Sequence, residues 1–191
     1  VRQEPEPVSY VDPKLVTHLF NELLDRGFRI LRVVEVRGEL SRYLQHRSVK
    51  EVGKALGYDE SCYELRDLAE ELVPFDLGQA LGRRATGRIW RQADFRIVFA
   101  KNRTDEWFGP ALVLGNLWHT LATPTDLVAL EYGVDPGDFA LAMLEKTPVH
   151  FGLIDAIHSR DGTPGNVFPY DVLRAPDGSG PEGAQIHRLG T

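Results

Sequence analysis

Apolar and polar positions near the N-terminus alternate with the period of a helix. Asp12-Pro13 suits a helix cap and first turn, and apolar side chains then recur at a spacing of about 3.6 as far as Arg26-Gly27. The preceding residues 1–11 contain several Glu and Pro residues and predict a tether. Phe28–Val36 is rich in β-branched residues and predicts a strand, with Leu40–Leu44 as its hairpin partner.

Helical spacing returns in the following segment. Ser48–Leu56 and Ser61–Val73 each begin with a serine that can cap a helix, and apolar side chains follow at helical intervals. Gly57 separates the two segments, and Pro74 follows the second one. We therefore expect a helical insert near residues 48–73.

In the C-terminal half the period changes to two. Asp94–Ala100 and Trp107–Leu114 predict a hairpin whose strands are joined by a polar turn at residues 102–106. Val149–His158 and Asn166–Leu173 predict a second hairpin, across a turn that contains Gly and Pro.

Two short helices are expected between these hairpins. Thr123-Pro124 and Asp135-Pro136 each combine a capping residue with a proline in the first turn. Strands that pair with sequence neighbours, together with helices in separate blocks, are typical of an α+β fold. We expect an antiparallel sheet built of hairpins with helices packed on one face, in a single domain over residues 12–175. Residues 176–191 are rich in Gly and Pro and predict a flexible tail.

The composition narrows the class of protein. With 191 residues, of which 42% are hydrophobic, the chain can bury one ordinary core. A net charge of −6 opposes binding to nucleic acid. No apolar run approaches the roughly 20 residues of a membrane span, and Val1–Pro7 lacks the cationic start of a signal peptide. We expect a cytoplasmic protein with no membrane partner, and leave open an upstream signal and the oligomeric state.

No metal or cofactor is expected. The six histidines are scattered without metal-binding spacing, and the glycines form no nucleotide-binding motif. The single cysteine, Cys62, excludes an intramolecular disulfide. Its expected place near a helix start favours a reactive thiolate, and His150 lies on a later strand, although Asp155 would face away from that histidine. A Cys–His hydrolase or deamidase is therefore one hypothesis.

Arginines supply the other candidate chemistry. Arg32 lies on the apolar face of its predicted strand, where a guanidinium needs an anionic partner, either an internal carboxylate or a ligand. Five arginines lie between Arg83 and Arg96, with Trp90 among them. They predict either a solvated face balanced by the acids of residues 60–71, or the lining of an anion pocket or nucleic-acid groove.

Several short sequence segments also follow one another along the chain in the order found in a known protein family. They are Gly38–Leu44, Arg96–Ala100, Trp107–Leu114, Tyr132–Leu141, Gly162–Pro164 and Phe168–Leu173. In this order the chain resembles the chorismate pyruvate-lyase family and its effector-binding relatives. The resemblance is spread over most of the chain.

This resemblance implies a small enzyme that eliminates pyruvate from an anionic cyclohexadiene substrate and needs no metal or redox cofactor. Arg96 would bind a substrate carboxylate, and Asp171 would stand where the family has a glutamate in its catalytic site. Arg32 would be a second cationic clamp, and Trp107 completes the candidate substrate-binding residues. The alternatives are a non-catalytic ligand- or partner-binding module of the same fold, and the Cys–His hydrolase.

Overall fold

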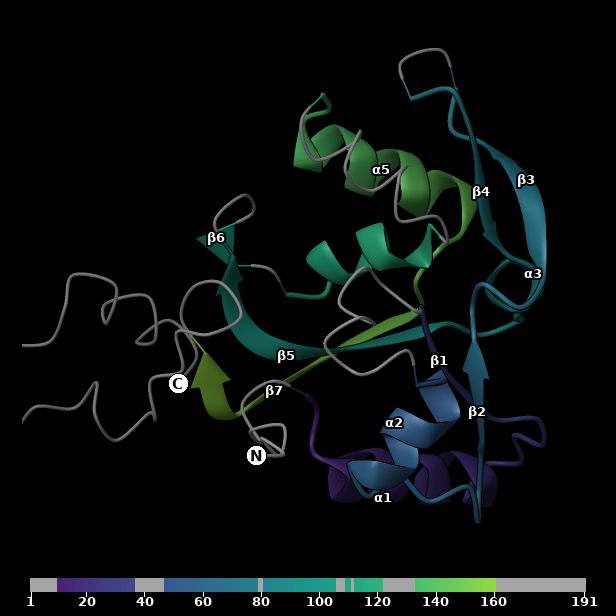
Figure 1. The fold of residues 1–191 in the computed structure, drawn as a ribbon, viewed down its shortest axis with the longest axis vertical. Helices are drawn as coiled ribbons and strands as arrows, with labels where there is room; N and C mark the ends of the chain where they lie inside the picture. The colour runs from purple at the N-terminus through teal and green to yellow at the C-terminus, as the bar shows by residue number, and fades with distance from the viewer. Residues whose placement is uncertain are drawn as a thin grey trace, which may run out of the picture.

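The described part of the chain has a mixed α+β fold with three small sheets (Figure 1). The structure, a computed structural model, describes residues 10–36, 47–78, 81–105, 109–110, 112–121 and 133–160. Most of the predicted tether and all of the predicted tail lie outside these residues. The α+β class expected from the sequence is confirmed.

The first two helices begin at the expected capping residues. Helix α1 (Pro13–Asp25) starts after Asp12, whose side chain accepts a hydrogen bond from the backbone N–H of Lys14 at 2.8 Å. Helix α2 (Val49–Ala55) starts after Ser48, which forms a reciprocal capping box with the third residue of the helix. Both helices were predicted correctly because the signals at their ends are local.

Two later helices in the C-terminal half of the chain each contribute buried side chains to the core. Helix α5 (Pro136–Lys146) begins at Asp135, whose side chain accepts from two backbone N–H groups, as the Asp-Pro pair predicted. A 3-10 helix, η3 (Gly115–Thr120), begins directly after the segment Trp107–Leu114 that was expected to form a strand. The helix expected from Thr123-Pro124 lies outside the described residues.

The predicted helix over Ser61–Val73 is wrong. This segment instead contains β2 (Glu64–Asp67) and the start of β3 (Leu72–Asp76). Strand β2 pairs in parallel with β1 (Arg32–Glu35), and helix α2 lies in the connection between them. Strand β3 pairs antiparallel with β4 (Arg83–Gly87).

The third sheet has the order β6-β5-β7. Strand β5 (Ile97–Asp105) runs through most of the expected polar turn and pairs antiparallel with β6 (Gly109–Pro110). On its other side it pairs in parallel with β7 (Phe151–Arg160). The second strand expected for each of the other hairpins, at residues 40–44 and 166–173, lies outside the described residues.

The prediction of an antiparallel sheet built of hairpins is therefore only partly correct. The β3–β4 and β5–β6 pairs are antiparallel, but the β1–β2 and β5–β7 pairs are parallel. Parallel partners are separated by a long crossover in the sequence, so the local pattern does not identify them. In Figure 1, α1, α2, β1 and β2 lie at one end, α5 and the β3–β4 pair lie at the other, and β5 and β7 cross between them.

Two groups of buried side chains form the core. The first core cluster consists of Val36, Leu68, Phe75, Leu77, Leu81, Trp90, Val98, Leu117, Trp118, Leu121, Phe139, Ala140 and Met143. The second core cluster consists of Val16, Phe20, Leu31, Tyr63 and Leu65. Strand β5 contributes to both, since Val98 belongs to the first and its neighbour Phe99 packs against the second. In the part of the chain that the structure describes, no helix is both long enough and apolar enough to span a bilayer.

Candidate anion-binding site

Arg32 lies on the solvent side of β1 and not in a core. Its side chain is 39% exposed, and its Nε donates to Oε2 of Glu64 at 3.2 Å. Leu31 and Val33 contact the second core cluster, so the alternation at this end of β1 is opposite to the expected one. The expected burial of Arg32 is therefore wrong. Its partner is a protein carboxylate, which is one of the two partners that the sequence left open.

Arg96 is buried and donates to backbone carbonyls. Its Nε donates to the carbonyl of Trp90 at 2.8 Å, its Nη2 to that of Arg91 at 2.7 Å, and its Nη1 to that of Pro148 at 3.5 Å. Only 8% of the residue is exposed, and burial lowers the pKa of the guanidinium from its ordinary value. Three donors of Arg96 thus hold the protein backbone. Binding of a substrate carboxylate by Arg96 stays a prediction from the resemblance.

Two other arginines of the run are balanced by carboxylates. Nε of Arg88 lies 3.3 Å from Glu71, and Nε of Arg83 lies 3.9 Å from Asp76. These pairs are exposed, and such pairs contribute little to stability. The pair of Arg88 with Glu71 agrees with the expected solvated face balanced by the acids of residues 60–71, whereas Arg83 pairs with Asp76, outside that segment.

The remaining two arginines lie beside the buried ring of Phe75. Arg84 is the register partner of Phe75 in the β3–β4 pair, so the two side chains share one face of the hairpin. The guanidinium carbon of Arg91 lies 5.6 Å from the centre of the same ring, and its Nη1 donates to the carbonyl of Pro74 at 2.9 Å. Neither Arg84 nor Arg91 forms an ion pair with a carboxylate of the described residues.

Arg84 carries an unsatisfied donor. Its Nε is buried and has no hydrogen-bond partner within the described ranges, and its Nη1 reaches the carbonyl of Arg83 only at 3.4 Å. A buried donor on a charged group is costly when it is unpaired, so a ligand oxygen or a water is expected there. The edge of a guanidinium matches two oxygens of a carboxylate or phosphate. A carboxylate or phosphate oxygen is therefore the kind of acceptor that matches the unpaired donor of Arg84.

The two residues of the hydrolase hypothesis have separate surroundings. Cys62 is half-buried against the second core cluster and precedes β2, so the expected helix start is not there. The exposed ring of His150 stacks on Phe95 with centroids 4.9 Å apart, and its Nδ1 accepts from the backbone N–H of Arg96 at 3.0 Å. These contacts show no link between cysteine and histidine, and the hydrolase hypothesis stays untested.

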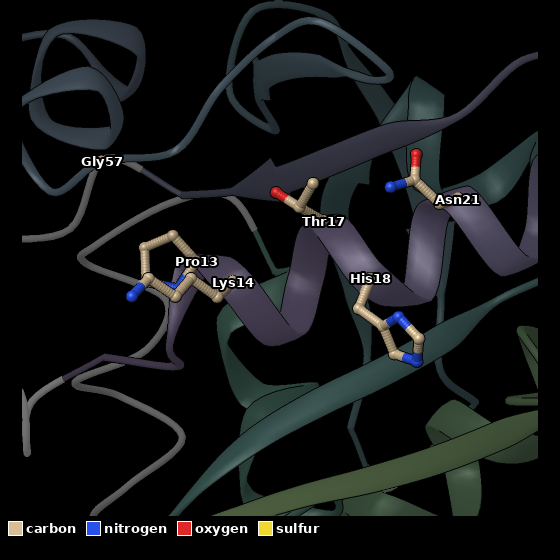
Figure 2. Close-up of a pocket in the computed structure, with 6 residues that line it drawn as sticks. All are labelled: Pro13, Lys14, Thr17, His18, Asn21 and Gly57. Carbon is tan, nitrogen blue, oxygen red and sulfur yellow. The ribbon is translucent and has the colours of Figure 1, made fainter.

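A shallow groove of about 320 Å³ follows the polar side of α1. Its lining consists of Pro13, Lys14, Thr17, His18, Asn21 and Gly57. Figure 2 shows that most of these side chains project from α1 itself, with Gly57 on the neighbouring segment. Among the described residues, no carboxylate lines this groove, and the polar side chains of Lys14, His18 and Asn21 are all exposed. The groove is thus a weaker candidate than the arginines beside Phe75, where a buried donor lacks a partner.

A buried ion pair joins β5 and β7. Nζ of Lys101 lies 2.8 Å from Oδ2 of Asp155, and the side chains are 5% and 0% exposed. The carboxylate also accepts from the backbone N–H groups of Asp12 and Ile157, at 3.0 and 3.1 Å. Burial raises the pKa of Asp155, but the bonds from Lys101 and the two N–H groups outweigh it, so the pKa lies below its ordinary value. Both oxygens are engaged, which fits a structural role.

Sequence reasoning missed this pair and the special position of Arg84. A signal for the pair was present, because Lys101 and Asp155 each interrupt an apolar strand. No signal separated Arg84 from its neighbours in the run, since the missing partner of Nε depends on the hairpin register and on packing. Two further candidate residues, Trp107 and Asp171, lie outside the described residues.

The described residues contain no group of three or more His, Cys, Asp or Glu side chains that could hold a metal ion. Compared with known protein families, with curated proteins and with solved structures, the chain gives no significant match.

Proposed function

We propose that this chain binds a small anionic molecule through Arg84 and Arg91. One observation carries the proposal: the Nε of Arg84 is buried without a hydrogen-bond partner in the described part of the chain. An oxyanion would supply the missing acceptor and neutralise the guanidinium at the same time. The function is that of a ligand-binding module.

The surroundings of the two arginines support this proposal. Arg91 is held over Phe75 and bonded to a backbone carbonyl, so its guanidinium is already fixed before a ligand arrives. A fixed cation loses little conformational entropy on binding. The neighbouring arginines Arg83 and Arg88 have carboxylate partners, which leaves the positive charge concentrated at Arg84 and Arg91.

Elimination of pyruvate from chorismate is the more specific proposal, and it rests on the resemblance. It requires that Asp171 supply the acid or base and that arginines clamp the substrate carboxylates. Chorismate is for this reason one of the probes below. Turnover would make the chain a lyase, and binding without turnover would make it a module without catalysis.

The test is a titration of ¹⁵N-labelled protein with inorganic phosphate, benzoate and chorismate, observed at the arginine Nε–Hε resonances. Chorismate consumption is followed by absorbance in the same samples. We expect one of the three anions to shift the Arg84 resonance and to saturate. Arg84→Gln and Arg91→Gln should each weaken this anion by about tenfold, because each loses charge-assisted hydrogen bonds.

Arg83→Gln is the matched control. It removes the same charge from the adjacent residue, whose side chain is 87% exposed, and should change the affinity by less than about twofold. If Arg83→Gln and Arg84→Gln weaken anion binding equally, the anion is attracted only by the general positive charge of this surface, and the proposal is wrong. If none of the three anions shows saturable binding, the partner of the Arg84 Nε is water and the proposal is wrong. Arg84→Lys serves if Arg84→Gln does not fold, since lysine keeps the charge without the planar edge.

A further inference from the structure

Helix α3 (Arg88–Arg91), which carries Arg91, is only a single turn long. So short a helix is not stable by itself, and its last carbonyls have no partners inside the helix. Arg96 supplies side-chain donors to two of them, since its guanidinium bonds to the carbonyls of Trp90 and Arg91 at 2.8 and 2.7 Å, while the Trp90 carbonyl also accepts a longer bond from the backbone N–H of Ala93 at 3.4 Å. The guanidinium also lies over the ring of Trp90, with its carbon 5.8 Å from the centre.

The other side of this guanidinium faces the end of α5. Its third donor reaches the carbonyl of Pro148, and the indole N–H of Trp90 donates to the hydroxyl of Thr147 at 3.3 Å. That hydroxyl in turn donates to the carbonyl of Met143 within α5. Arg96 therefore joins the last residue of α3 to the segment that follows α5.

We propose that Arg96 is a positioning residue for the anion site, which rests on the function proposed above. Arg96 does not contact the anion. It holds the C-terminal carbonyls of α3, and in this way it places the guanidinium of Arg91 over Phe75. The ligand class is the oxyanion that Arg84 and Arg91 receive together.

The test uses Arg96→Lys, which keeps the positive charge but has one amino group in place of the planar fork. This group can satisfy one of the two carbonyls well, so the turn of α3 loosens. With the anion that saturates the wild type, we expect affinity to fall by about tenfold, the effect of losing one bond to a charged group. Val16→Ala is the control for general destabilisation, since Val16 is buried in the second core cluster, and it should leave the affinity unchanged.

A double-mutant cycle separates positioning from other effects. If Arg96 acts through Arg91, then Arg91→Gln and the double variant Arg91→Gln with Arg96→Lys should bind the anion equally well. Additive losses in the double variant would overturn the proposal. Unchanged affinity in Arg96→Lys would overturn it as well.

Wild-type protein gives a second readout that needs no variant. On saturation, the Nε–Hε resonances of Arg84 and Arg91 should shift while that of Arg96 stays in place, because its donors remain on carbonyls. A dominant shift at Arg96 would make it a ligand contact and overturn its positioning role. If wild-type protein binds no anion, or binds it without sensitivity to Arg84→Gln, the proposed function fails first and the positioning role fails with it. If wild type binds as proposed and Arg96→Lys does too, only the positioning role fails.

Discussion

At the scale of single residues, the buried pair of Lys101 and Asp155 is expected to dominate stability. Replacing Lys101 by Met leaves a buried carboxylate without its counter-ion, which should lower the free energy of unfolding by about 3–5 kcal/mol. Adding Asp155→Asn removes the charge and keeps one side-chain oxygen, which can accept from the N–H group of Asp12 or from that of Ile157 but not from both, since the two bonds use different oxygens of Asp155. Urea unfolding should therefore show the double variant to be more stable than Lys101→Met alone, and the opposite order would contradict a buried charge pair.

The same pair predicts a dependence of stability on pH. The pKa of Asp155 is lower in the folded state than in the unfolded chain, so the folded state binds its proton less readily. The stability from this pair is complete above the unfolded pKa of about 3.9, and it is lost as the pH falls through the folded value. The difference in the free energy of unfolding, wild type minus the double variant Lys101→Met with Asp155→Asn, should become less positive or more negative below about pH 4, because only the wild type has this carboxylate to protonate. Urea midpoints measured from neutral to acidic pH check this, and a difference that becomes more positive on acidification would contradict it.

Individual residues also mark where sequence reasoning reaches its limit. The sequence indicated the arginine run as a candidate anion site. In the structure its members differ: two of them pair with carboxylates, Arg96 bonds to backbone carbonyls, and two lie beside Phe75. Which arginine meets a carbonyl and which meets a carboxylate depends on distant segments, such as Pro148 for Arg96. No local pattern contains that information.

At the scale of elements, Gly87 is expected to be irreplaceable where β4 meets α3. A Cβ at this position would lie 2.6 Å from the carbonyl oxygen of Leu68, a backbone atom that cannot move alone. Gly87→Ala should therefore cost about 1–3 kcal/mol, as overpacking does in a tight core. Gly152→Ala is the control, because its Cβ would meet side-chain atoms of Val113, the nearest at 3.1 Å, and no backbone atom within 4 Å is among its three nearest neighbours. Equal unfolding free energies for the two variants would contradict this assignment.

Elements with local signals at their ends were predictable, and elements that depend on a distant partner were not. Helix α1 has Asp12 before a proline, and its start was predicted correctly. Strand β2 was mistaken for a helix, because Leu65 and Leu68 have helical spacing although they enter different core clusters. The alternation of Tyr63 and Leu65, both buried, with the exposed Glu64 was the signal for a strand. Pairing with β1 decides between the two structures.

At the scale of the whole molecule, the two core clusters are expected to unfold together. Adjacent residues of β5 face different clusters, so loss of one cluster removes support from the strand that completes the other. Trp90 and Trp118 lie in the first cluster and Phe20 in the second, where its ring is 4.7 Å from that of Tyr63. The third tryptophan, Trp107, lies outside the described residues, so in a Trp107→Phe background tryptophan fluorescence can report on the first cluster while a substitution is made in the second.

Phe20→Ala should lower the free energy of unfolding by about 3–5 kcal/mol, because a large buried side chain is replaced by a cavity. If the clusters form one cooperative unit, the tryptophan fluorescence midpoint in urea should fall together with the midpoint from far-ultraviolet circular dichroism. Val16→Ala should shift both midpoints in the same direction by less, and it serves if Phe20→Ala is largely unfolded. A fluorescence midpoint that stays at the wild-type value, while the helical signal is lost earlier, would show two independent units. In that case a control made in the second cluster would not report on the stability of the anion site, and it would have to be moved to the first.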